Sequence, residues 1–240
     1  MRFFKYLKSD RGFSLAELAI ALTIVGILAS FSLGVGNVYQ SNAQVTKTKA
    51  KIQLIASSLA AYVGANGTLP CPAPITSTPT TTNFGKADNS TGCTNTILLD
   101  TNNIAVGMVP FQDLALQADM VTDEWSDKFV YAVSTNLTNS GTFTSGTGAI
   151  TVEDGNNNPI SSSVAYFIFS PGQNRNGAYP RDSNSVVNVC NNSYLDYANC
   201  VFELNNSTNT FMDAATHDNS FDDIVNWSTK TMIGSGLSGT

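Results

Sequence analysis

The sequence predicts an α+β fold in which a long N-terminal transmembrane helix packs on a small antiparallel β-sheet head with long loops. Two observations support the helix: a continuous apolar run at residues 13–33 and an amphipathic heptad pattern after it. In the remainder, short apolar segments alternate with turns rich in Gly, Asn and Ser. Short strands joined by loops and laid on a helix are typical of the α+β class.

Composition limits the classes of function. Of the 240 residues, 42% are apolar and 12% are charged, and the formal net charge is −6. An acidic chain argues against a nucleic-acid partner, because phosphate binding needs clustered Lys and Arg. Thirteen Phe and eight Tyr argue against a disordered chain. One His and four Cys leave few residues for a zinc site or a His-based catalytic site.

The first 33 residues have the pattern of a membrane anchor. The apolar run contains one ionisable side chain, Glu17, and follows a basic segment. The basic residues are Arg2, Lys5, Lys8 and Arg11. A helix of this length, at ~1.5 Å per residue, spans about 31 Å and crosses a hydrocarbon core of ~30 Å. Basic residues stay on the cytoplasmic side, so we expect the rest of the chain outside the cytoplasm.

Two other interpretations of this segment stay open. A secretory signal peptide also begins with basic residues, but its apolar run is usually about 7–15 residues long and a small-x-small cleavage site follows it. Here Phe31 interrupts that pattern. A plain signal anchor explains the length and orientation of the run, but not the carboxylate of Glu17. Such a group costs about 2.5–3.5 kcal/mol on insertion scales and usually has a partner.

The segment Gly12-Phe13-Ser14-Leu15-Ala16-Glu17 resembles the cleavage signal of type IV pilins and type II secretion pseudopilins. The resemblance implies a pilin-like fold, and implies that prepilin peptidase cuts between Gly12 and Phe13 and N-methylates Phe13. It also implies that Glu17 pairs with the N-terminal amine of a neighbouring subunit in a filament. Such pairing would offset part of the cost of placing both charges in lipid.

The resemblance also implies partners and a location. The partners are prepilin peptidase, other pilin or pseudopilin subunits, an inner-membrane assembly platform, and the membrane itself through residues 13–33. The chain would cross the inner membrane once, with a cytoplasmic N-terminus and a periplasmic head, and then join a pseudopilus or a cell-surface pilus. Many relatives have a Pro near the end of the apolar run. Here Gly34 and Gly36 stand instead, and Gly weakens a helix.

A single helix is expected over residues 14–63. Its second half has a heptad-like apolar stripe that packs under the head, with three lysines on the polar side. The stripe consists of Val38, Val45, Ile52, Ile55, Leu59 and Tyr62, and the lysines are Lys47, Lys49 and Lys51. Residues 64–67 supply C-cap chemistry. The expected organisation is a leader at 1–12, a transmembrane or filament-core half at 13–36, an amphipathic half at 37–64 and a head at 65–240.

The head is expected to contain short strands. The Pro-rich residues 69–74 end the helix, and residues 75–83 read as an exposed loop. Residues 110–118 have a composition that allows a short helix. Strands are expected at residues 128–134, 148–152, 164–170 and 201–204.

Four head segments sharpen the resemblance by their order along the chain. Residues 123–131 resemble a D-x-W-G hairpin motif of pseudopilins, with Ser126 in place of the Gly. Residues 169–174 resemble an S-x-G segment, and residues 221–227 resemble a D-D-I-x-x-W strand. Residues 69–72 resemble a Cys-Pro segment that follows the long helix in some relatives. The 50 residues at 172–221 exceed the length expected in a major pseudopilin.

The cysteines are expected to form disulfides. Cys71, Cys93, Cys190 and Cys200 all follow the apolar run, and an even number of Cys on the oxidising side of a membrane favours pairing. Three pairings are open; Cys71 with Cys93 and Cys190 with Cys200 is favoured, because each closes a short loop. The spacings of 22 and 10 residues do not offer the C-x2-4-C pairs of a zinc site.

The sequence near the C-terminus contains further acids and the one histidine. Four acids near the C-terminus could bind calcium, because the resemblance implies calcium before the last strand, but no ligands are assigned. The favoured interpretation is that they are solvated loop carboxylates, with Asp222 or Asp223 capping a turn. These acids are Asp213, Asp218, Asp222 and Asp223. His217 lies in a polar loop, and the chain has no nucleophile elbow, P-loop or dinucleotide signature. We therefore expect no enzyme activity and no cofactor, and calcium in the head is the open alternative.

The expected function is a structural subunit of a type IV pilus-like or type II secretion filament, as the resemblance implies. The alternative is a minor pilin that acts as an adhesin or a cargo-binding tip module. A third hypothesis, an anchored periplasmic enzyme, lacks a recognisable set of catalytic residues.

Overall fold

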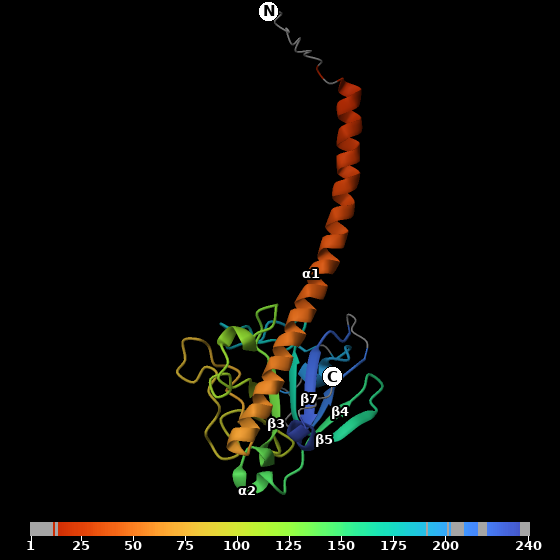
Figure 1. Ribbon diagram of the computed structural model, residues 1–240. Helices are drawn as coiled ribbons and strands as arrows, with labels where there is room; N and C mark the ends of the chain where they lie inside the picture. Colours follow the sequence, from red (N-terminus) through yellow and green to blue (C-terminus); the bar gives the residue numbers. More distant parts are fainter. Residues whose placement is uncertain are drawn as a thin grey trace, which may run out of the picture. The chain divides into compact units, whose positions relative to one another are not determined.

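The computed structural model describes Gly12 and residues 14–190, 192–200, 202, 209–215 and 220–235, without the side chains of residues 28–38 and 234–235. The chain divides into two compact units, residues 1–43 and 44–240. Helix α1 (Leu15–Asn66) contributes residues to both units (Figure 1). The observed helix is close to the one expected at residues 14–63, and it continues through Gly34 and Gly36.

The end of α1 follows the expected glycine chemistry. Gly67 has a φ of 72°, and its N–H donates to the carbonyl of Val63 over 2.8 Å. A glycine in the left-handed region just past the last helical residue satisfies a free carbonyl of the final turn. The expected stop at residues 64–67 is therefore confirmed.

The sequence predicts a membrane span in the apolar first half of α1. Within the part of the chain that the structure describes, no helix meets both the length and the hydropathy that a membrane crossing requires.

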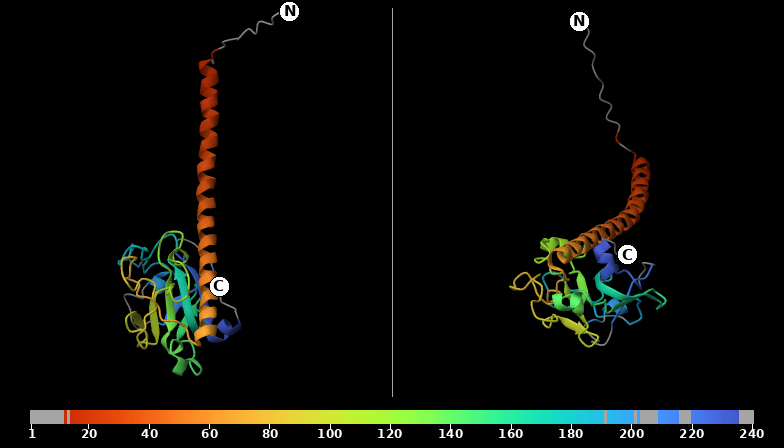
Figure 2. Two further views of the ribbon diagram at one scale, coloured as in Figure 1. Left: turned by 60° about the vertical axis from the view of Figure 1, so that its left-hand side comes forward. Right: turned by 60° about the horizontal axis from the view of Figure 1, so that its bottom comes forward.

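The head contains a seven-stranded sheet in the order β1-β2-β3-β5-β4-β6, and β7 also pairs with β5 (Figures 1 and 2). The strands are β1 (Ile97–Leu99), β2 (Ile104–Met108), β3 (Val130–Ser134), β4 (Ile150–Glu153), β5 (Pro159–Ser170), β6 (Thr210–Met212) and β7 (Ile224–Thr229). Short helical segments are η1 (Ala118–Val121), η2 (Thr135–Leu137), α2 (Ser140–Phe143), α3 (Tyr197–Cys200) and α4 (Lys230–Ser235). The α+β class is thus observed.

The strand pairs are antiparallel, as expected, except for one parallel pair that makes the sheet mixed. Strands β4 and β6 pair in parallel, with Val152 opposite Phe211. A parallel pair needs a connection of about a dozen or more residues. The long segment between β5 and β6 provides that connection, and it lets the chain return in the same direction.

Strand β5 is the centre of the sheet. Its last residues pair with β3 on one edge and β7 on the other, so that Phe167 lies opposite Ala132 and Trp227. Residues 164–170 are all buried, whereas most side chains at 159–163 are exposed in the hairpin with β4. The expected strand at 164–170 therefore corresponds to the buried part of a longer strand.

Two local expectations fail. Residues 111–115 form turns rather than the short helix expected at 110–118, because Ala115 has a φ of 54° and Gln117 is extended. Residues 75–83 are not wholly exposed, since Ile75 and Ser77 are buried and their carbonyls accept hydrogen bonds from Lys128 Nζ. The strand expected at 201–204 falls largely outside the described residues.

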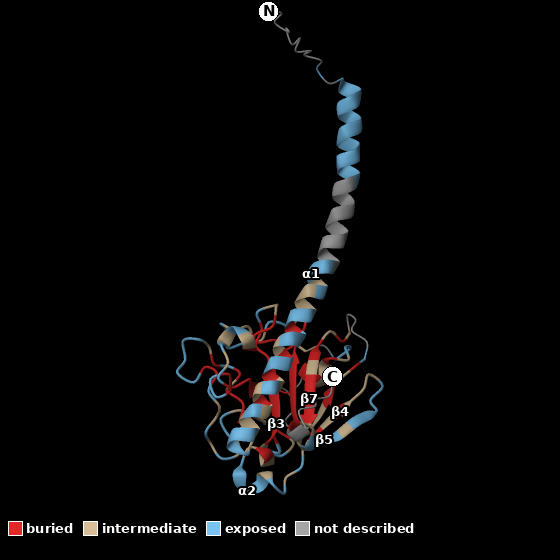
Figure 3. Cartoon of the chain, viewed as in Figure 1, coloured by how far each residue is buried: buried red, intermediate tan, exposed pale blue. Residues whose placement is uncertain are grey.

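The core of the head joins the second half of α1 to the sheet. Ile52, Ile55 and Leu59 are at most 2% exposed and belong to the same cluster as residues of β2, β3 and β5. Figures 2 and 3 show this part of α1 against one face of the sheet. Burial of each such side chain contributes about 1.5–3 kcal/mol. The amphipathic stripe is thus confirmed over the residues that belong to the head.

Candidate functional site

The start of α1 is closed by two reciprocal hydrogen bonds. The N–H of Ser14 donates to Glu17 Oε2 over 2.9 Å, and the N–H of Glu17 donates to Ser14 Oγ over 3.2 Å. This S-x-x-E arrangement is a capping box, which satisfies donors that a helix N-terminus leaves free. The expected cleavage point is next to it: Gly12 is exposed, with open space where a Cβ would project, and Phe13 lies outside the described residues.

The first turns of α1 are exposed in the isolated chain (Figure 3), and most of their large side chains are apolar. These apolar side chains are Leu15, Leu18, Ile20, Leu22, Ile24, Val25 and Ile27, each more than half exposed. A soluble monomer rarely exposes a contiguous apolar surface of this kind. The surface therefore requires another apolar environment.

Polar contacts fasten the second half of α1 to the head. Lys51 Nζ lies 2.7 Å from Glu124 Oε1 and donates to the carbonyl of Thr122 over 2.9 Å. The buried hydroxyl of Thr48 accepts the N–H of Glu124 over 3.3 Å. Lys47 approaches the same carboxylate at 3.8 Å. Two of the three lysines expected on the polar side of the helix thus bind the loop that begins the D-x-W motif.

Three of the four head motifs noted in the sequence meet in one place. Asp123 Oδ1 accepts the N–H groups of Trp125 and Asp127, each over 2.9 Å. Asp123 Oδ2 accepts the hydroxyl of Ser170 over 2.6 Å, and Ser170 Oγ accepts the N–H of Gly172. Gly172 has a φ of 68°, and a Cβ there would overlap the backbone of Asp222, so the S-x-G and D-D-I segments fit only with Gly.

Ser126 explains why the resembled motif has a glycine at its place. Its φ is 70°, in the left-handed region that L side chains rarely adopt. The turn from Asp123 to Asp127 therefore keeps the geometry of a glycine turn at some cost in backbone energy.

Two disulfides join the favoured cysteine pairs. Cys71 pairs with Cys93, and Cys190 pairs with Cys200. The first links the Pro-rich segment after α1 to the loop before β1. The second closes a ten-residue loop that ends in α3. In the chain-entropy description, loops of this size contribute about 3 kcal/mol each to the free energy of unfolding.

Three carboxylates gather where β7 begins. Asp196, Asp222 and Asp223 each place an oxygen within 4.8 Å of the others. Asp196 and Asp223 are 1% and 2% exposed. In the part of the chain that the structure describes, none of the three forms an ion pair with a basic side chain. The cluster therefore concentrates negative charge without a visible counter-charge.

Asparagine side chains hold this cluster. Asn174 Nδ2 donates to Asp196 Oδ2 over 2.6 Å, and Asn199 Nδ2 donates to Asp223 Oδ2 over 2.8 Å. Asp196 Oδ1 and Asp222 Oδ1 are buried and have no hydrogen-bond partner. Burial raises the pKa of Asp222 to about 6 and raises the pKa of Asp223 well above its usual range. Unpartnered buried oxygens with raised pKa values fit a hard cation such as Ca²⁺.

The four acids considered for calcium are only partly brought together. Asp222 and Asp223 are in the cluster, but Asp213 accepts the indole N–H of Trp227 over 2.8 Å. Asp218 and His217 lie outside the described residues. Sequence reasoning missed Asp196, which is 26 residues before Asp222. Its position in the loop closed by Cys190 and Cys200 is the one signal that could have suggested it.

Comparison with models of known protein families gives one match. Residues 7–33 match the model of the prokaryotic N-terminal methylation motif, which is the prepilin-cleavage signal of type IV pilins and pseudopilins. No curated protein and no solved structure matches the chain significantly.

Proposed function

We propose that the chain is a pilin- or pseudopilin-type subunit that is processed at its N-terminus and assembles into a filament through α1. The observation that carries the proposal is the methylation motif at residues 7–33. The apolar side chains exposed on the first turns of α1 support it, because packing against other subunits or lipid would bury them. Residues 13–33 are the proposed inner-membrane anchor. Residues 65–240 are the outward-facing head, and they form one compact unit with residues 44–64 of α1.

Processing would leave Phe13 as the first residue. Prepilin peptidase would cut after Gly12, where the exposed backbone offers access, and would methylate the new amine. Gly12→Ser introduces a side chain at the cleavage point. This variant should keep the leader and migrate as the unprocessed precursor in electrophoresis. If its mobility instead equals that of the processed wild type, the proposed cleavage point is wrong.

Glu17 has two separable roles in this proposal. Its carboxylate closes the capping box, and its charge would pair with the terminal amine of a neighbouring subunit. Glu17→Gln keeps a capping-box side chain but removes the charge, whereas Glu17→Ala removes both. Both variants should be cleaved normally and should fail to enter filaments. Normal incorporation of Glu17→Gln would show that the carboxylate acts only as a cap.

A second candidate role is a minor subunit that acts as an adhesin or a cargo-binding tip. Deletion of the gene separates the two. Loss of all filaments or of secretion indicates a structural or priming subunit, and intact filaments without attachment indicate a tip binder.

We also propose that the acidic cluster of Asp196, Asp222 and Asp223 binds Ca²⁺. The support is the pair of unpartnered buried oxygens on Asp196 and Asp222. The full chain in detergent should unfold at a higher temperature with Ca²⁺ than with EDTA, because a cation that binds only the folded state stabilises it. Asp196→Asn should abolish this shift, and Asp100→Asn, in a partly buried turn outside the cluster, should not. An equal shift in Asp196→Asn would exclude the site.

A further inference from the structure

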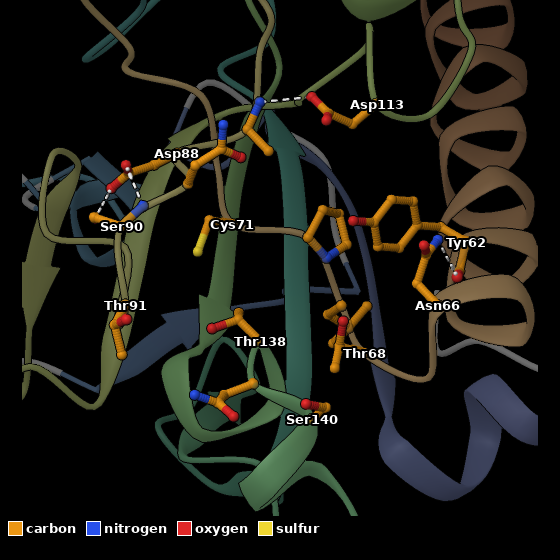
Figure 4. Close-up of a pocket in the computed structure, with 16 residues that line it drawn as sticks. Tyr62, Asn66, Thr68, Cys71, Asp88, Ser90, Thr91, Asp113, Thr138 and Ser140 are labelled. Atoms are coloured by element: carbon orange, nitrogen blue, oxygen red, sulfur yellow. Dashed lines mark hydrogen bonds between the residues drawn. The ribbon is translucent and has the colours of Figure 1, made fainter.

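A second feature of the head is a polar cavity near the end of α1. Its volume is about 460 Å³, within the range of roughly 300–1,000 Å³ that is typical of ligand sites. Its walls are formed by the end of α1 with residues 68–71 after it, the loop at residues 87–92, Asp113, and residues 138–140 at the start of α2 (Figure 4). The acidic cluster contributes no residue to it.

The residues that line the cavity are mostly polar and uncharged, and none of them is basic. Among the residues around the cavity are two carboxylates, Asp88 and Asp113, and no Lys, Arg or His. Hydroxyl and amide side chains make up most of the rest, and Tyr62 supplies an aromatic ring. An anionic ligand would meet only negative charge here. A ligand that is neutral and rich in hydroxyl groups matches this surface.

The walls of the cavity are held in place by the protein itself. Asp88 accepts hydrogen bonds from the backbone and side chains of Ser90 and Asn95. Asp113 Oδ2 accepts the N–H of Ala87 over 2.7 Å. The disulfide from Cys71, on the cavity floor, ends at Cys93, directly after the loop. Both carboxylates are therefore committed to fixing the loop, and a preformed site binds with a smaller loss of entropy.

Other lining groups have unused hydrogen-bonding capacity. Among the described residues, no hydrogen-bond partner is found for the side chains of Thr68, Asn89, Thr91 or Ser140, nor for the hydroxyl of Tyr62. Figure 4 shows Tyr62 and Thr91 on opposite sides of the cavity, with Thr68 between them and Ser140 lower in the view. These side chains offer both donors and acceptors, and the ring offers an apolar face. A sugar ring has the same combination of hydroxyls and an apolar C–H face.

We propose that this cavity binds a neutral saccharide. The hydroxyls of Thr91, Ser140 and Tyr62 contact the sugar hydroxyls, and the Tyr62 ring packs on a C–H face. The binding is a property of the head and does not rest on the filament role proposed above.

The test uses the full-length chain in detergent and measures binding by isothermal titration and saturation-transfer NMR. The probes are lactose, maltose, cellobiose and N,N′-diacetylchitobiose, with sialyllactose, spermidine and a tetra-alanine peptide as chemically different ligands. At least one neutral saccharide should bind with a Kd of about 1 mM or tighter. Binding of none of the four, or binding only of the acid, the polyamine or the peptide, would overturn the proposal.

Variants place the binding in the cavity. Tyr62→Phe and Thr91→Val each remove one hydroxyl and should weaken saccharide binding by about three- to tenfold. Thr82→Val changes an exposed Thr outside the cavity and should bind like the wild type. Unfolding midpoints confirm that each variant is folded, and Ser140→Ala replaces any that is not. Unchanged affinity in the folded cavity variants would assign the sugar to another surface and overturn the proposal.

Discussion

Leu22 and Leu59 belong to the same helix but lie in opposite environments. Leu22 is 64% exposed, whereas Leu59 is fully buried in the core of the head. Around Leu22 the helix is apolar on all sides, and around Leu59 apolar residues form one stripe. A helix that is apolar all round is normally buried. The apolar side chains in the first half of α1 therefore need a burying environment outside this chain. Those of the stripe around Leu59 in the second half are buried by the sheet within the same compact unit.

The sharpest test of this contrast is a matched pair of Leu→Ala substitutions. Leu59→Ala should lower the free energy of unfolding of the head by about 2–5 kcal/mol, because it leaves a cavity in a packed core. Leu22→Ala should change it by less than about 0.5 kcal/mol. Urea unfolding of both variants in detergent, followed by near-UV circular dichroism, measures the difference. Equal losses would show that the two halves of the helix are not separate environments.

The first disulfide is expected to have the next largest effect, again confined to the head. Replacing both Cys71 and Cys93 by Ser should reduce the free energy of unfolding by about 3 kcal/mol, since the unfolded chain regains the entropy of an open loop. Thermal unfolding with and without a reducing agent checks this. If the reductant destabilises the double variant as much as the wild type, the effect comes from the other disulfide.

The stability of the head should also depend on pH, because the carboxyl group of Asp123 is buried there. Burial raises the pKa of Asp123 to about 6, from about 4 in the unfolded chain. Between these values the folded chain holds a proton that the unfolded chain has released, so stability falls as pH rises from about 4 to 6 and is constant above. The contribution is about 2–3 kcal/mol. Asp123→Asn should remove this part of the pH dependence in urea titrations, and a profile parallel to the wild type would refute it.

The smallest expected effect is an increase in stability. Ser126→Gly should raise the free energy of unfolding by up to about 1 kcal/mol, because glycine adopts the positive φ of this turn without strain. Ser145→Gly, in an exposed position without a positive φ, is the matched control. A loss of stability in Ser126→Gly equal to that of the control would mean that the turn is not strained.

Helical periodicity made most of α1 predictable. The heptad residues Ile52 and Leu59 marked its buried face, and the glycines after Val63 marked its end. The spacing Ser14-x-x-Glu17 is also that of a capping box, so the cap at the start of α1 is encoded locally. Local chemistry therefore accounts for the elements that were found.

The strands that were missed have a common physical cause. In β2 all five residues are buried, so the alternation that marks a half-exposed strand is absent. Gly107 lowers its strand propensity further, yet a Cβ there would overlap the carbonyl of Ala73. The acidic cluster could not be predicted from the sequence for a different reason. Asp196 reaches Asp222 only through the folding of a long loop, which no local pattern encodes.

Mass spectrometry of the protein purified from its native membrane tests the central claim most directly. We predict a chain that begins at Phe13, carries one methyl group on its N-terminal amine, and has lost the mass of residues 1–12 and of four hydrogens for the two disulfides. A chain that retains residues 1–12, or that is cut after the apolar run, would contradict the account.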